Sequence, residues 1–445
     1  MRKWRQGAAL ILLVALGWLV LMVMGSGQQA QARSWWWPFG AQEEEIEIPP
    51  PQLRAFLDSF RVNLRLTPKA KRITRAGDDY ALHDVEFFSL SVNGEPLAVG
   101  RARLIELKAA RLAQGLARFR AIMAHDVTFS GKTRKGRTFR ISIPKVDVGA
   151  LSILMQGAGK TPQEKFIEMM PIAEAGEIPR IIFHLEDGEP LELRGLRWKW
   201  AGDRRTGAGK GELNLGEMQV PLAALMERDN RPAGDVRRIR ELGLEVLTLT
   251  GKSQQQAAWL EEGALSLSWS VELGAKEAGF VQFGLTDMRL PRALLEQSKK
   301  LDSMLQKRSG SANPGQMPSA EELRMLAQLG GLSVKGARLG WRDAGLTRRV
   351  LALQAREQGL SVEEYIERQI ITLRARLSSL GVPQDKLDRL VLAMEVFLKD
   401  PRDILIELQG ATPLSISDVL TALIMPSLLF GKLNLRVVVN GKEMR

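Results

Sequence analysis

The sequence predicts an α+β fold: an antiparallel sheet with helices on one side, built as an extended array of about four units of ~70 residues each. Aromatic anchors recur at near-constant spacing, because Phe129, Trp200, Trp269 and Trp341 are separated by 71, 69 and 72 residues. Apolar and polar residues alternate in the short runs before the tryptophans, which is the period of a half-buried strand. Helix-start signals follow at similar distances. We therefore expect each unit to contain a strand hairpin, a helix pair and a returning strand.

The N-terminus carries an export signal. Arg2, Lys3 and Arg5 precede an uninterrupted apolar run over residues 8–25, the pattern of a Sec-type signal. These 18 residues are also long enough to cross ~30 Å of hydrocarbon. Ala30-Gln31-Ala32 offers a cleavage site for signal peptidase, whereas the length of the apolar run would allow it to stay in the membrane. Residues 1–32 are therefore either a cleaved signal peptide or a retained anchor. Basic residues ahead of the run place the remaining chain outside the cytoplasm. We expect a periplasmic protein tethered to the inner membrane.

Residues 33–52 are predicted to form a linker. Trp35, Trp36, Trp37 and Phe39 are typical of a membrane–water interface, and the alternative is an apolar tail that packs on the folded domain. The acidic run 43–45 and the proline run 49–51 then make the segment charged and stiff. We expect an N-terminal β-rich module over residues 53–124.

The elements of the units follow in order after that module. Second strands are expected at 138–143, 211–215, 279–285 and 349–353, and helical turns near Gly149, Pro221, Pro291 and Ser361. Capping boxes begin at Thr161, Ser319 and Ser361. Returning strands are expected at 181–185, 244–249, 332–339 and 404–408. The predicted repeats span 125–195, 196–264, 265–336 and 337–445, the last including a C-terminal strand and helix cap.

No pattern in the sequence points to catalysis. The chain has no cysteine, and only His83, His125 and His184 could serve as imidazole ligands. His83 and His125 both occur as His-Asp-Val with an aromatic residue four positions later, which indicates structural echoes rather than ligands. A Gly-x-Ser-x-Gly elbow is missing, and Gly159-Lys160-Thr161 lacks the glycine that a phosphate-binding loop needs at position 154. We expect no enzyme activity, cofactor or metal.

The chain is basic, with 63 Lys and Arg against 51 Asp and Glu and a net charge of +12. Basic clusters lie at 69–75 and 132–140. In a cytoplasmic protein they would favour nucleic-acid binding, but export makes that partner unexpected. They are interpreted as solvated hairpin tips or as contacts to anionic lipid headgroups.

Alternation places candidate residues on one apolar sheet face. Trp198 and Trp200 share a face of one strand, Leu267 and Trp269 share a face of another, and Trp341 ends a third run. Two structures would satisfy this pattern. Either the face is an open groove that takes an acyl chain, or the helices cover it as a closed core.

Residues 80–131 carry a resemblance. The segments Tyr80–Val85, Arg101–Leu107, Leu112–Leu116 and Ile122–Phe129 resemble the N-terminal module of AsmA-like envelope proteins. The rest of the chain is similar to uncharacterised proteobacterial envelope proteins, at Trp341–Leu346 and Phe397–Pro401. The resemblance implies a β-rich protein anchored in the inner membrane, mostly periplasmic and concerned with lipid traffic or envelope homeostasis.

Two functional hypotheses follow. The first is a non-catalytic, membrane-tethered periplasmic protein that handles lipid or another amphiphile, or serves envelope homeostasis. The alternative is a scaffold or assembly subunit of an envelope protein complex, with a protein partner in place of lipid.

Overall fold

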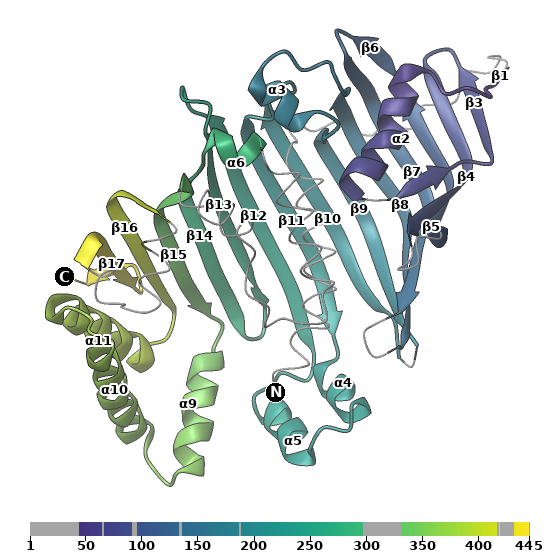
Figure 1. Ribbon diagram of the computed structural model, residues 1–445. Helices are drawn as coiled ribbons and strands as arrows, with labels where there is room; N and C mark the ends of the chain where they lie inside the picture. Colours follow the sequence, from purple (N-terminus) through teal and green to yellow (C-terminus); the bar gives the residue numbers. More distant parts are fainter. Residues whose placement is uncertain are drawn as a thin grey trace, which may run out of the picture. The chain divides into compact units, whose positions relative to one another are not determined.

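The computed structural model describes residues 44–64, 66–90, 96–132, 136–186, 188–296, 331–415, 418 and 431–444 (Figure 1). The predicted signal or anchor (1–32), the aromatic part of the linker and the capping box at Ser319 lie outside these ranges. In the described part, no helix is both long and apolar enough to span a membrane. The chain divides into two compact units, 1–219 (unit 1) and 220–445 (unit 2).

Long antiparallel strands dominate both units, as the sequence predicted. Over the described ranges there are 18 strands. In unit 1, β2 and β3 both pair with β4, and the order then runs β4, β5, β7, β8, β9, β10, β11. The bounds are β1 Glu44–Glu45, β2 Thr67–Lys69, β3 Arg72–Ala76, β4 Asp79–Leu90, β5 Pro96–Lys108, β6 Arg111–Ala113, β7 Leu116–Lys132, β8 Thr138–Leu154, β9 Pro171–Leu185, β10 Leu191–Gly202 and β11 Gly209–Val220.

Helix α2 (Pro51–Leu64) covers part of one face of the unit 1 sheet (Figure 1). Leu53, Phe56 and Phe60 recur at helical spacing, so they form one apolar stripe. Leu53 and Phe56 are buried in a cluster with side chains from β4, β5, β7 and β8. Complete burial of a residue such as Leu53 contributes about 1.5–3 kcal/mol. The module predicted as β-rich over 53–124 therefore has a helix as part of its core.

In several strands of unit 1, the alternation of buried and solvent-facing side chains shifts by one residue at the same level of the sheet. We call this level the row of shifted alternation, or the row. In β4 the large buried side chains are Tyr80 and Leu82 on one side of the row, then Val85 and Phe87 on the other. The intervening Asp84 has a left-handed backbone, with φ 48°. The shift puts two consecutive side chains on the solvent face and returns the next apolar residue to the core.

The row crosses neighbouring strands in register. Asp126 in β7 also has a positive φ, 52°, and Arg103 of β5 lies between the two aspartates. Buried residues of β5 change alternation at the same place, between Ala102 and Ile105. The two His-Asp-Val motifs are therefore equivalent positions on this row. Each histidine has a polar neighbour: His83 Nε2 lies 3.2 Å from Thr74 Oγ1, and His125 Nε2 lies 3.1 Å from Glu106 Oε2.

In unit 2, strands β12 to β18 pair antiparallel in chain order. Its strands are β12 Leu247–Trp259, β13 Leu265–Ala275, β14 Gly279–Leu290, β15 Ser333–Asp343, β16 Asp403–Ser415, β17 Leu433–Val439 and β18 Lys442–Met444. Its helices are α4 Leu222–Arg228, α5 Ala233–Glu241, α6 Arg292–Glu296, α9 Leu346–Glu357, α10 Val362–Ser379 and α11 Gln384–Lys399.

Two capping boxes are confirmed. Thr161 caps α3 (Pro162–Ile167) with Glu164 as the reciprocal partner, and Ser361 caps α10 with Glu364. In each helix the cap hydroxyl accepts from the backbone N–H of the glutamate, whose side chain accepts from the cap backbone. The helices expected near Pro221 and Pro291 are also present, as α4 and α6.

Two element predictions were wrong. The helical turn expected near Gly149 is absent, because β8 continues to Leu154 and pairs with β7 and β9. The strand expected at 349–353 lies inside helix α9. Leu351, Leu353 and Ala355 are buried, so the helix shows an alternating burial that imitates a strand. The helix begins at Leu346 with Gly345 as its N-cap, and the Asp343 carboxylate accepts from the backbone N–H of Thr347 at 2.9 Å.

Candidate functional site

The structure divides the five candidate apolar-face residues between the two units. Trp198 and Trp200 are buried in unit 1. Trp198 lies across the strand from Gly176, and its indole N–H has no hydrogen-bond partner in the described part of the chain. Trp200 packs with Leu154 and with Ile167 of α3. In unit 1 these tryptophans are therefore core residues.

Leu267, Trp269 and Trp341 lie on one face of β13, β14 and β15 in unit 2. Residues directly opposite each other in antiparallel strands share a face. Val281 is opposite both Leu273 and Trp341, and Phe283 is opposite Leu339. We call this surface the apolar face; its members are Leu265, Leu267, Trp269, Val271, Leu273, Val281, Phe283, Leu285, Ala337, Leu339 and Trp341.

The apolar face is charge-free and partly open to solvent. None of its eleven members is ionisable. Leu273 is 37% exposed, Val281 43%, Phe283 37% and Leu339 53%. Trp269 meets Phe283 edge-on, with ring centroids 5.7 Å apart, and its indole N–H donates to Ser253 Oγ at 2.9 Å. The polar end of Trp269 is thus satisfied inside the protein, which leaves its ring as apolar surface.

One side of the apolar face continues into a closed core. Helix α11 buries Ala393 and Phe397 against β16 and β17, and Trp341 packs at the border of that cluster. Ile406 of β16 lies opposite Leu339 and belongs to the same cluster. Among the described helices, the covering by α11 stops at β15, and Leu273, Val281 and Phe283 on β13 and β14 are exposed.

The opposite face of these strands is polar. Glu272 of β13 is 8% exposed, forms ion pairs with Lys252 (3.4 Å) and Arg342 (2.9 Å), and accepts from Gln282. Burial raises the pKa of Glu272, but the Gln282 hydrogen bond and the two cations outweigh it, so the pKa lies below its usual value. Unit 2 thus presents an amphipathic sheet.

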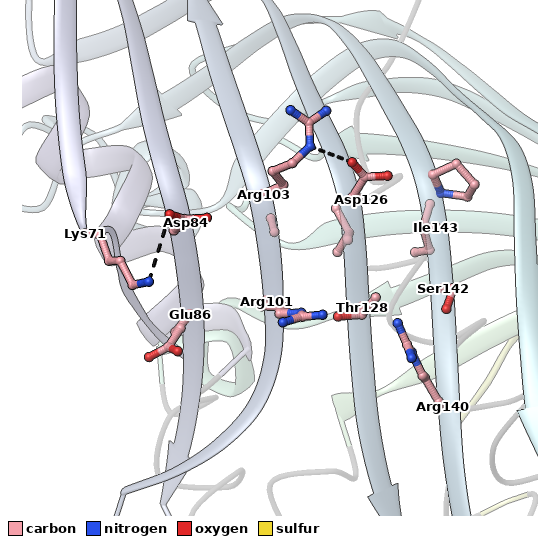
Figure 2. A pocket seen from close by; sticks show the side chains of 13 residues that line it. Lys71, Asp84, Glu86, Arg101, Arg103, Asp126, Thr128, Arg140, Ser142 and Ile143 are labelled. Atoms are coloured by element: carbon pink, nitrogen blue, oxygen red, sulfur yellow. Dashed lines mark hydrogen bonds and ion pairs between the residues drawn. The ribbon is translucent and has the colours of Figure 1, made fainter. Parts of the chain in front are cut away.

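Unit 1 has a polar pocket of about 450 Å³ on the face opposite α2, lined by residues of β4, β5, β7 and β8 and by Lys71, which precedes β3 (Figure 2). Arg103 Nε donates to Asp126 Oδ2 at 2.6 Å. Lys71 Nζ lies 4.0 Å from Asp84 Oδ2. The charged side chains on its lining are Lys71, Asp84, Glu86, Arg101, Arg103, Asp126 and Arg140. Because positive and negative groups alternate along one row, most of these charges neutralise one another.

A second pocket, of about 440 Å³, lies at the turn between β10 and β11. Arg205 donates to Glu164 at 2.5 Å and to the backbone oxygen of Gln114, and Arg204 is ion-paired with Glu174. The hydrogen bond from Arg205, together with those from the backbone of Lys160 and Thr161, lowers the pKa of Glu164 to about 2. These contacts connect the turn to α3, so the cluster has a structural role.

Catalytic constellations were not predicted from the sequence, and among the described residues no group of three or more His, Cys, Asp or Glu could hold a metal ion. The exposed members of the apolar face and the polar pocket were missed by sequence reasoning. Alternation in 279–285 could have identified Val281 and Phe283. The pocket depends on register between distant strands, which the sequence does not display.

Comparison with known proteins adds one finding. A family model described only as "Uncharacterized protein" matches residues 272–440, a segment that includes β14–β16, α9–α11 and all four exposed members of the apolar face. No curated protein matches the chain.

Proposed function

We propose that this chain is a non-catalytic, membrane-tethered envelope protein that binds the acyl chain of a lipid or other amphiphile on the apolar face of unit 2. The observation that carries the proposal is the continuity of that face. It begins in the core under α11 and extends, without a charged residue, to four side chains that are 37–53% exposed.

The energetics favour an apolar occupant. Exposed contiguous apolar surface marks interaction sites in soluble domains. Each methylene removed from water contributes about 0.8 kcal/mol, so five methylenes of an acyl chain lying along the strands contribute about 4 kcal/mol. Side chains on one face repeat about every 6.8 Å along a strand, which gives an extended chain a regular series of contacts.

The sequence supplies the location. The basic segment and apolar run at residues 2–25 predict export and attachment to the inner membrane. The resemblance of residues 80–131 to AsmA-like proteins supports the same compartment and the same class of ligand. A tethered protein works beside the bilayer that provides its ligand.

The repeat remains part of this proposal. Two successive segments support it, because each contains two strands, then helix, then a further strand: β10, β11, α4, α5, β12, and then β13, β14, α6, β15. Trp200 and Trp269 lie in the first strand of each segment, whereas Trp341 lies in β15, the last strand of the second segment. Related segments with different burial would allow one copy to serve as core and the next as a binding face.

Photo-cross-linking in membranes tests the proposal. A fatty acid with a terminal diazirine is incorporated into membranes that contain the full chain, and the labelled peptides are identified by mass spectrometry. We expect label on β13–β15. The variant Phe283→Gln/Leu339→Gln should lose most of it, while Ile371→Gln, on α10 and 70% exposed, should keep it. Label that is spread over the chain, or a cross-linked protein partner without lipid, would favour the scaffold alternative.

A further inference from the structure

Two arginines in the polar pocket of unit 1 have no acidic partner. Arg101 of β5 and Arg140 of β8 are exposed, and neither makes a hydrogen bond or ion pair within the described residues. The other two cations of the pocket are occupied, since Arg103 binds Asp126 and Lys71 lies beside Asp84. The unused positive charge is therefore confined to two side chains.

The two guanidinium groups converge. Figure 2 shows Arg101 and Arg140 extending toward Thr128 from opposite sides. Arg101 points away from Glu86, its direct cross-strand neighbour, and Glu86 forms no ion pair with any described residue. Like charges that converge repel each other unless an anion lies between them.

Hydroxyl groups complete the arrangement. Arg101 is opposite Thr128, and Thr128 is opposite Ser142, so these three residues form one row on the pocket face. Arg140 precedes Ser142 by two positions in β8 and thus shares its face. Both hydroxyl residues and both arginines line the same cavity of about 450 Å³.

We propose that this pocket binds a phosphate group. The two guanidinium groups each present paired N–H donors that match phosphate oxygens, and the hydroxyls of Thr128 and Ser142 donate to the remaining oxygens. The ligand is either a soluble phosphate or the phosphodiester of a lipid headgroup. This site lies on a different unit from the apolar face, so it does not depend on the acyl-chain proposal.

The test is a titration of the full chain in a neutral detergent, followed by ³¹P NMR line broadening. The two probes are inorganic phosphate and glycerophosphoglycerol, a headgroup without acyl chains. Loss of charged hydrogen bonds should weaken binding about tenfold or more in Arg101→Gln/Arg140→Gln. The charge-matched control is Arg348→Gln/Arg376→Gln, two exposed arginines of unit 2, and it should bind as the parent does.

A substitution at Glu86 should change the affinity for phosphate in the opposite direction. Glu86→Gln removes a negative charge beside the anion and should strengthen binding about threefold, an effect that a purely structural residue would not produce. Tighter binding of glycerophosphoglycerol identifies a lipid headgroup, and tighter binding of inorganic phosphate identifies a soluble ligand. The proposal is overturned if neither probe binds, or if the Arg101/Arg140 variant binds as well as its control. The Phe283→Gln/Leu339→Gln variant should retain phosphate binding, which separates the two proposals.

Discussion

Gly176→Ala should destabilise unit 1 because the indole of Trp198 occupies the space above Gly176. A Cβ on Gly176 would lie 1.9, 2.3 and 2.4 Å from three ring atoms of Trp198, where ordinary contacts are 3.4–4 Å. The ring must therefore move by more than 1 Å. Trp198 is only 6% exposed and packs in a cluster with Ile178 and Leu213, so the ring has little room to move.

Overpacking of this kind costs about 1–3 kcal/mol. The change is measured by urea denaturation of the full chain, followed by far-ultraviolet circular dichroism because the partner variant removes a tryptophan. Trp198→Leu should relieve the clash, so the double variant should be more stable than the sum of the single changes by about 1–3 kcal/mol. A Gly176→Ala protein within about 0.5 kcal/mol of the parent, or strict additivity in the double variant, would refute the packing argument.

Three further predictions address acid stability, backbone strain and topology. Because the pKa of Glu164 is lowered to about 2, its ionised form contributes at most about 3 kcal/mol to the free energy of unfolding; this contribution is present above pH ~4.5 and is lost as the pH falls toward 2. Glu164→Gln should abolish that loss in acid-denaturation curves, and a curve like that of the parent would contradict the prediction. Asp126→Val should cost about 1–3 kcal/mol more than Asp126→Gly in urea denaturation, because both variants lose the Arg103 ion pair but only valine is strained at a φ of 52°. A reporter that is active only in the cytoplasm, fused after Arg445, should be silent, whereas strong activity would contradict export.

Local signals in the sequence predicted local structure well. The capping boxes at Thr161 and Ser361 identified the first turns of α3 and α10 because the cap depends on residues only three positions apart. Alternation likewise predicted the strands that contain Trp200, Trp269 and Trp341. The error at 349–353 arose because buried residues of α9 recur at every second position over a short stretch, and because its N-cap, Gly345, has no side chain that would signal a helix start.

The candidate sites depended on information that is not local. The sequence predicted that Trp198 and Trp269 both belong to an apolar sheet face. In the structure Trp198 is buried in the core of unit 1, whereas Trp269 lies on a partly open face in unit 2. Which apolar face a helix covers depends on tertiary packing, and among the described helices α11 packs at one border of the apolar face. In the sequence, the row through Asp84 and Asp126 is marked by the repeated His-Asp-Val motif. The shift of alternation at these positions becomes apparent only when the strands are placed in register.

The central claim is that the apolar face of unit 2 holds a lipid acyl chain, and native mass spectrometry of the full chain released from detergent tests it most directly. The account predicts a population with the added mass of a phospholipid, which Phe283→Gln/Leu339→Gln reduces severalfold and Ile371→Gln leaves unchanged. A chain that carries no lipid but retains a stoichiometric protein partner, or bound lipid that both variants retain equally, would contradict it.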